Sequence, residues 1–147
     1  MAGTVNFKPE RYHTVTPYMV VRDVSALIDF VKQVFDAMEI ERTQRPDGSI
    51  MHAEVRIGDS VVMMGETQDD SAVMPAMLHL YLEDVDAAYR RALDAGAASL
   101  REPTDEFYGD RSAGVKDSFG NQWWMATHIE DVSPEEMQRR AEAQENF

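Results

Sequence analysis

The chain has 147 residues, a formal net charge of −13 and 44% hydrophobic residues, which is enough apolar content to bury the core of one domain or of two small modules. The negative charge repels phosphate backbones and anionic lipids, so nucleic acid and membrane are poor candidates as partners. The sequence has no Cys and no apolar run long enough for a signal peptide or a membrane span, and we therefore expect a cytoplasmic protein without disulfides or thiol chemistry.

The first predicted strand, residues 18–22, leads into an amphipathic helix. Asp23 is the predicted N-cap of that helix, whose apolar residues recur at helical spacing. Three strands follow: a short one at residues 38–42, one at residues 50–57 after a Pro-Asp-Gly turn, and one at residues 61–64 after a Gly-Asp turn. This half of the chain therefore predicts the order strand, helix, strand, strand, strand.

The same order returns in the second half. Residues 78–83 predict a strand, Asp84 is the predicted N-cap of a second amphipathic helix, and Gly96 is its predicted end. After this helix the sequence predicts, in order, a strand at residues 98–101, a loop at residues 107–111, a strand ending at Val115 and a strand at residues 123–127.

The repeat predicts an α+β fold of two βαβββ modules, about residues 12–66 and 76–130, within a single domain at residues 1–130. An acidic, polar segment joins the modules. Ser133 begins a capping-box pattern with Pro at the first helical position, which predicts a C-terminal helix within residues 131–147.

Several short segments carry a resemblance to a known family: Thr16-Pro17-Tyr18, His52-Ala53-Glu54, residues 57–60, residues 107–111, residues 117–120, Trp123 and residues 126–128. Together with the repeated unit, they resemble the vicinal oxygen chelate superfamily of glyoxalases, bleomycin-resistance proteins and extradiol dioxygenases, and within it the PhnB-like branch. The resemblance implies sheets that curl into a cup, and a homodimer. In the metal enzymes of the family it implies four His or Glu ligands, one on the first and one on the last strand of each module.

The family's four ligand positions can be located in this sequence. Two lie on the first strands, the same number of residues before Asp23 and before Asp84, and two lie at equivalent places on the last strand of each module. They are occupied by Thr16, Met77, Trp124 and, with a one-residue ambiguity, Val62 or Met63. None of these side chains offers the imidazole or carboxylate group that hard or borderline divalent metals take as ligands. We therefore expect no metal at the family's site and no other cofactor.

Strand alternation places polar side chains on the predicted cup face. His52 and Glu54 share the polar face of one strand, and His79 and Tyr81 share that of another, with Tyr18 equivalent to His79. These residues also have structural explanations, because a polar strand face is commonly a solvated one and a His beside leucines is often hydrogen-bonded in the structure.

Other candidates leave similar alternatives open. Trp123 and Trp124 are adjacent in a predicted strand, so their side chains must lie on opposite faces of the sheet. Trp124 either packs against other side chains of the protein or stacks on a ligand. The loop at residues 107–111 either packs as a turn with a contact between its Asp and Arg residues, or closes over a ligand. His13 and His128 lie near strand ends, where we expect surface roles only.

Two functions fit these observations. We favour a metal-free module that binds a hydrophobic or aromatic small molecule, for which the acidic charge favours a cation. Its predicted ligand-binding residues are Tyr18, Met63, Met77, His79, Tyr81, Phe107, Tyr108, Arg111 and Trp124. The alternative is an enzyme, a glyoxalase-like lyase, an isomerase or a dioxygenase-type oxygenase, with His52, Glu54 and His79 as acid and base groups or as displaced metal ligands.

Overall fold

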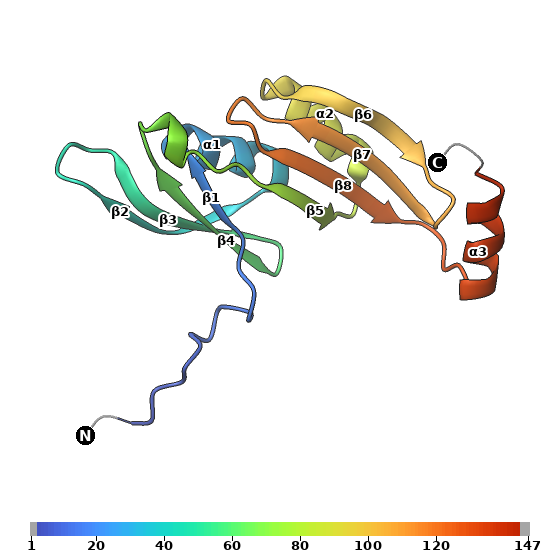
Figure 1. The fold of residues 1–147 in the computed structure, drawn as a ribbon, viewed down its shortest axis with the longest axis horizontal. Coiled ribbons are helices and arrows are strands. Elements are labelled where there is room, and N and C mark those ends of the chain that lie inside the picture. The colour runs from blue at the N-terminus through green and yellow to red at the C-terminus, as the bar shows by residue number, and fades with distance from the viewer. Residues whose placement is uncertain (1–2, 145–147) are drawn as a thin grey trace. The chain divides into compact units, whose positions relative to one another are not determined.

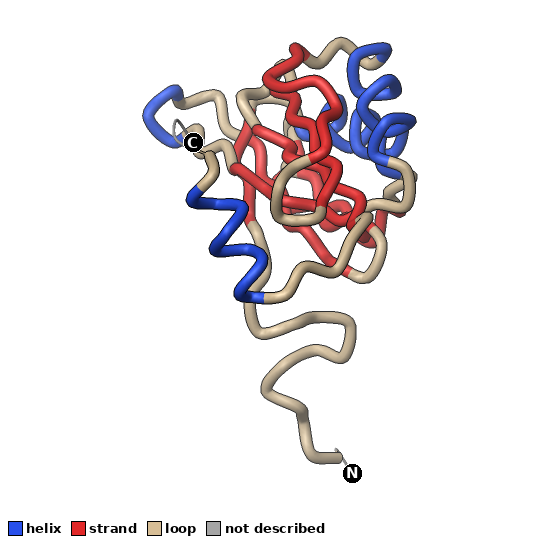
Figure 2. The backbone as a smooth tube through the Cα atoms, turned by 90° about the vertical axis from the view of Figure 1, so that its right-hand side faces the viewer, coloured by secondary structure: helices blue, strands red, loops and turns tan. Residues whose placement is uncertain are grey.

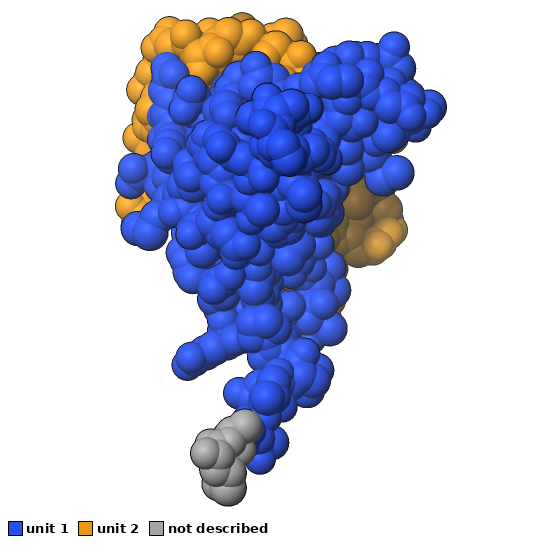
Figure 3. All heavy atoms as spheres, turned by 90° about the vertical axis from the view of Figure 1, so that its left-hand side faces the viewer, with its two compact units in different colours: residues 1–76 blue, residues 77–147 orange. Residues whose placement is uncertain are grey.

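The computed structural model of the protein describes residues 3–144. The chain divides into two compact units, Met1–Ala76 (unit 1) and Met77–Phe147 (unit 2), which Figure 3 colours separately. Each unit contains a strand, a helix and three further strands in that order, so the predicted pair of βαβββ modules is confirmed.

Unit 1 holds a four-stranded sheet with the order β1-β4-β3-β2 (Figure 1). β1 runs parallel to β4, and the other neighbouring pairs are antiparallel. Its elements are β1 (Tyr18–Val21), α1 (Val24–Phe35), β2 (Met38–Gln44), β3 (Ile50–Ile57), β4 (Ser60–Glu66) and a short 3-10 helix, η1 (Asp70–Ala72). Before β1, residues 3–17 form neither helix nor strand (Figure 2).

Helix α1 covers one face of this sheet. Asp23 is its N-cap, as predicted, and accepts a hydrogen bond from the backbone N–H of Ala26 at 3.0 Å. The apolar stripe of α1 is fully or almost fully buried on the strand side chains that point toward it, among them Met19, Val55 and Met64. Because strand residues alternate between faces, the neighbouring side chains of these strands lie on the opposite, open face.

Unit 2 repeats the arrangement with the sheet order β5-β8-β7-β6, in which β5 and β8 are parallel. Its elements are β5 (Met77–Tyr81), α2 (Val85–Asp94), β6 (Ala98–Asp105), β7 (Asp110–Lys116), β8 (Gln122–His128) and α3 (Pro134–Glu142). Asp84 caps α2 by accepting from Ala87 N at 3.1 Å, and Gly96 follows its end with a φ of 98°. Both predicted helix boundaries are therefore confirmed.

The core of unit 2 lies between α2 and one face of its sheet. Trp123 is fully buried there, and its Nε1 donates to the Asp117 carboxylate at 2.8 Å. The Asp117 oxygens also accept from the backbone N–H groups of Phe119 and Asn121, so the turn between β7 and β8 is fixed by the same carboxylate. Trp124 consequently points to the open face, away from α2.

The predicted C-terminal helix is confirmed as α3, and the Ser133 side chain accepts a hydrogen bond from a backbone N–H of its first turn. Arg140 on α3 donates to the carbonyl of Phe107 at 3.0 Å and pairs with Glu130 at 2.8 Å. The bond to Phe107 fastens α3 to the loop that connects β6 and β7, and the pair with Glu130 ties α3 to the segment that follows β8.

Several strand boundaries differ from the prediction: β2 and β4 extend further than predicted, β5 ends at Tyr81, and β7 begins at Asp110 inside the predicted loop. β6 continues to Asp105 instead of ending near Arg101, although it contains Pro103. β6 is an edge strand, where the missing N–H of a proline need not break a ladder. The segment predicted as a linker is also tied down, because Met74 exchanges backbone hydrogen bonds of 2.9 and 3.0 Å with Val20 of β1.

None of the helices within residues 3–144 combines the length and the apolar character needed to cross a membrane.

Candidate functional site

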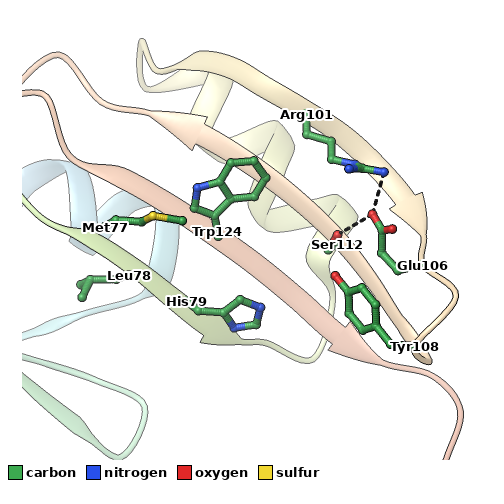
Figure 4. Close-up of a pocket in the computed structure, with 8 residues that line it drawn as sticks. All are labelled: Met77, Leu78, His79, Arg101, Glu106, Tyr108, Ser112 and Trp124. Atoms are coloured by element: carbon green, nitrogen blue, oxygen red, sulfur yellow. Dashed lines mark hydrogen bonds and ion pairs between the residues drawn. The ribbon is translucent and has the colours of Figure 1, made fainter. Parts of the chain in front are cut away.

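The open face of the unit 2 sheet carries a pocket of about 310 Å³ (Figure 4). Side chains from β5, β6, β7 and β8, together with the loop between β6 and β7, form its walls. The lining residues are Met77, Leu78, His79, Arg101, Glu106, Tyr108, Ser112 and Trp124. The pocket thus belongs entirely to one unit, on the side of the sheet opposite α2.

Trp124 forms a flat apolar wall of this pocket. Its six-membered ring lies against Gly114 of β7, where a Cβ atom would stand only 2.6 Å from ring carbons. Its Nε1 donates to the Gln122 side chain at 3.1 Å, which fixes the orientation of the half-buried indole. Only glycine at position 114 lets the ring lie this close to the strand backbone.

The polar end of the pocket is built around Glu106. Its carboxylate, with a side chain only 8% exposed, pairs with Arg101 Nη2 at 2.8 Å and accepts from the Ser112 hydroxyl at 3.1 Å. Both interactions use the same oxygen, Oε1. Arg101 itself is 46% exposed, so its guanidinium borders solvent while it neutralises the buried carboxylate.

Aromatic rings complete the pocket region. The Tyr108 ring packs edge to face on Phe107, with ring centroids 5.3 Å apart. The His79 ring lies 5.1 Å from that of Tyr81, whose hydroxyl donates to Asp110 at 2.8 Å. This hydrogen bond raises the pKa of Tyr81 above its ordinary value.

A carboxylate–histidine cluster continues from Tyr81 along the end of the sheet. The Asp110 side chain, which is almost fully buried, faces His128 Nδ1 at 2.8 Å, and His128 Nε2 faces Asp131 at 2.8 Å. The hydrogen bonds to Asp110 and then Asp131 raise the pKa of His128 above its ordinary value. His128 was predicted to have a surface role only; the ring is half exposed, yet it bridges two carboxylates.

The open face of unit 1 carries a second polar cluster. His52 Nε2 lies 2.9 Å from Glu54 Oε2, and His52 Nδ1 lies 3.1 Å from the Tyr18 hydroxyl. The structure thus brings together the two residues predicted to share a strand face and adds Tyr18 from β1. His79, the third predicted acid or base group, belongs to unit 2 and lines the pocket there.

Glu54 is held by residues from the segment before β1. The Tyr12 hydroxyl donates to it, and Arg11 Nη2 lies 3.2 Å from it. Burial raises the pKa of Glu54, but the hydrogen bonds from Tyr12, His52 and Arg11 together lower it below its ordinary value. Tyr12 and Arg11 were not predicted as site residues, because the segment before β1 has no periodicity from which to place them.

Four predicted ligand-binding residues line the unit 2 pocket: Met77, His79, Tyr108 and Trp124. Tyr18 and Met63 lie in unit 1, where they pair across β1 and β4. Phe107 packs beside Tyr108 without lining the pocket, and Tyr81 lies beside His79.

Arg111 is placed differently from its predicted role. Its guanidinium forms two hydrogen bonds to Asp86 of α2, at 2.8 and 3.0 Å, and one to Asp105 at 3.0 Å. Arg111 and Ser112 are adjacent in β7, so their side chains lie on opposite faces of the sheet. Ser112 lines the pocket, and the side chain of Arg111 therefore lies on the face that α2 covers. Arg111 makes these bonds in place of the contact with Asp110 that was one of the two alternatives for this loop. The lining residues Leu78, Arg101, Glu106 and Ser112 were not predicted.

The strand register settles which residue of β4 corresponds to Trp124. Trp124 pairs with His79 of β5, and Met63 pairs with Tyr18 of β1, so Met63 is the equivalent residue. Within residues 3–144 there is no group of three or more His, Asp or Glu side chains arranged to hold a metal ion. Met63 and Trp124 carry neither an imidazole nor a carboxylate group, so the donor set that the metal enzymes require does not fit these positions.

Comparison with known proteins agrees with this architecture. Residues 11–125 match the family described as the Glyoxalase/Bleomycin resistance protein/Dioxygenase superfamily. An uncharacterized protein of Mycobacterium bovis is 33% identical over 151 residues, covering 95% of this chain and 97% of its own.

Solved structures show the same fold at lower identity. TioX from Micromonospora sp. ML1 superposes with a TM-score of 0.66 at 24% identity, covering 80% of this chain and 99% of its own. A PhnB protein from Bacillus cereus, described as a putative 3-demethylubiquinone-9 3-methyltransferase, gives a TM-score of 0.66 at 13% identity, covering 78% and 99%.

Proposed function

Because the chain belongs to the glyoxalase/bleomycin resistance protein/dioxygenase superfamily, we propose that it binds a flat, hydrophobic or aromatic small molecule in the unit 2 pocket, without a metal ion. The ligand stacks on Trp124 and is sequestered there without chemical change. The proposal assigns a non-catalytic function to a fold that also occurs in enzymes, because a fold alone does not specify the chemistry of a protein.

The observation that carries the proposal is the position of the Trp124 indole. One face of the ring is pressed on Gly114, and the ring lines the pocket. Met77 adds a flexible, polarisable side chain beside it, which suits contact with aromatic rings. A volume of about 310 Å³ lies near the lower end of the range for small-molecule pockets, so a ligand of one or two fused rings fits best.

The metal-free part of the proposal rests on the chemistry of the ligand positions. Trp124 occupies the closing-strand position in unit 2, and Met63 its equivalent in unit 1. Elemental analysis of protein purified without chelator should find no stoichiometric zinc, nickel, manganese or iron. One bound equivalent of any of these metals would refute this part.

Tryptophan fluorescence tests the binding itself. The chain has two Trp residues: Trp123 is buried under α2, whereas Trp124 lines the pocket. A bicyclic aromatic alcohol such as naphthalenemethanol should quench the wild-type emission saturably and raise the melting temperature. In Trp124→Phe, which retains Trp123 as the only indole, the quenching should be lost. A panel of such compounds that neither quenched nor stabilised the wild type would refute the proposal.

The hydrogen bonds of His52 favour a second candidate function, an acid–base enzyme acting on the open face of unit 1. The Glu54 carboxylate orients one ring nitrogen of His52 and leaves the other facing the Tyr18 hydroxyl, an arrangement that can move a proton. Turnover of an aldehyde or catechol substrate that is abolished in His52→Gln but retained in Trp124→Phe would favour this enzyme over the binding module.

A further inference from the structure

We infer that the unit 2 pocket selects aromatic ligands that carry an anionic oxygen, such as a carboxylate or phenolate. The inference rests on the proposed function and names the class of ligand. It follows from the hydrogen-bond donors beside Trp124, which lie on the same open face as the indole (Figure 4).

Three groups beside Trp124 have donors to offer. Arg101 reaches the Glu106 carboxylate through one nitrogen, Nη2, and a guanidinium carries five N–H groups. Within residues 3–144, neither ring nitrogen of His79 nor the Tyr108 hydroxyl has a hydrogen-bond partner. These groups come from β5, β6 and the loop before β7, so they surround the pocket from different sides.

The carboxylate side of the pocket is small and little exposed. Glu106 is the only carboxylate among the lining residues, and its Oε1 interacts with both Arg101 and Ser112. With only 8% of its side chain exposed, it offers little surface to a ligand ammonium group. Arg101, by contrast, is 46% exposed, and the N–H groups that do not reach Glu106 are available to a ligand.

The net charge of −13 acts against an anion, but the pocket lining contains one Arg, Arg101, and one acidic residue, Glu106, so the excess negative charge lies outside the lining. Charges farther apart than a Debye length, about 8 Å at physiological ionic strength, are largely screened. A hydrogen bond from a guanidinium to an anionic oxygen acts at contact and is among the strongest that proteins form. The local donors therefore decide the selectivity, and the inferred ligand is anionic, in contrast to the cation that the overall charge favours.

Three probes of the same ring system test this selectivity: naphthoate, naphthalenemethanol and naphthylmethylammonium. They place a negative, neutral or positive group on one flat bicyclic ring. Calorimetric titration at physiological ionic strength should show naphthoate binding about 10-fold more tightly than the ammonium compound, with the alcohol between them.

Arg101→Gln supplies the matched variant. It should reduce naphthoate affinity about 10-fold and leave that of naphthalenemethanol within about 2-fold of wild type. Arg90→Gln is the control, because Arg90 is exposed on α2, on the other side of the sheet, and its removal changes the net charge equally. Equal losses of naphthoate affinity in both variants would overturn the role of Arg101.

The outcomes separate this inference from the proposed function. If the ammonium compound or the alcohol binds as tightly as naphthoate, the inference fails while stacking on Trp124 stands. If none of the three probes binds, the proposed function itself fails.

Discussion

The six-membered ring of Trp124 lies so close to Gly114 that a Cβ atom on the glycine would stand 2.6 Å from it. This contact joins β8 to β7 on the open face of unit 2 and fixes the indole where the pocket needs a flat wall. At the equivalent positions of unit 1, Glu54 of β3 pairs with Met63 of β4, so unit 1 has no counterpart of this glycine–tryptophan contact.

Gly114→Ala tests the contact directly. The added methyl group should push the indole off the strand, lower stability by about 1–3 kcal/mol and abolish fluorescence quenching by naphthalenemethanol. Urea unfolding and the ligand titration measure these two effects. The control is Gly65→Ala in β4 of unit 1, where the added Cβ atom would stand 3.1 Å from the Tyr18 hydroxyl. Because this substitution lies outside the unit 2 pocket, it should leave the ligand titration unchanged. Unaltered binding in Gly114→Ala would contradict this role.

The two adjacent tryptophans should differ in their contribution to stability. Trp123→Phe removes a fully buried indole and its hydrogen bond to Asp117, which should cost about 2–4 kcal/mol. Trp124→Phe alters a half-buried ring on the open face and should cost less than about 1 kcal/mol. Urea denaturation of both variants provides the comparison, and equal costs would show that the assignment of the two faces is wrong.

The fold could be predicted from the sequence because its signals are local and occur twice. Asp23 and Asp84 each cap a helix after a strand, and each helix is followed by three short strands separated by turns. Alternation within a strand likewise predicted correctly that His52 and Glu54 share a face, and that Trp123 and Trp124 do not.

The rest of the site depends on pairing between strands, which the sequence does not display. Arg101, Glu106 and Ser112 come together because β6 pairs with β7 through two irregularities in register, between Ser99 and Thr104. A one-residue shift there would place different side chains in the pocket. Arg111 was assigned to ligand binding from its loop, yet its position in β7 directs it toward α2.

The His128 cluster predicts how stability changes with pH. Its hydrogen bonds to Asp110 and Asp131 raise the pKa of His128 above the ordinary value of 6.5, so the folded protein binds this proton more tightly than the unfolded chain. The stabilisation from His128 is complete at pH values below the pKa of His128 in the unfolded chain. It is lost as the pH rises through the pKa of His128 in the folded protein.

Melting temperatures of wild type and His128→Gln measured across this range should therefore converge as the pH becomes alkaline. A difference between the two proteins that does not change with pH would contradict the proposed protonation of His128.

Glu54 predicts the opposite trend at acidic pH. The pKa of Glu54 is lowered because the hydrogen bonds from Tyr12, His52 and Arg11 outweigh the effect of burial. The stabilisation from Glu54 is therefore present at pH values above its pKa in the unfolded chain, and it is lost as the pH falls through its pKa in the folded protein. Glu54→Gln should lower the free energy of unfolding by about 1–3 kcal/mol at neutral pH.

The matched control is Glu41→Gln, since Glu41 is exposed and lies 3.4 Å from the same Arg11. It should change stability by less than about 0.5 kcal/mol. Urea unfolding at neutral and acidic pH tests both variants. A neutral-pH cost for Glu54→Gln no greater than that of Glu41→Gln would contradict the buried network.

Nitrogen–proton NMR of the tryptophan indoles tests the central claim most directly. The two indole N–H signals of the protein can be assigned with Trp124→Phe, and naphthalenemethanol is then titrated into the wild type. We predict that the Trp124 signal shifts progressively and saturates, while that of Trp123, buried against Asp117, stays in place. An unmoved Trp124 signal at saturating ligand would contradict binding on this wall of the pocket.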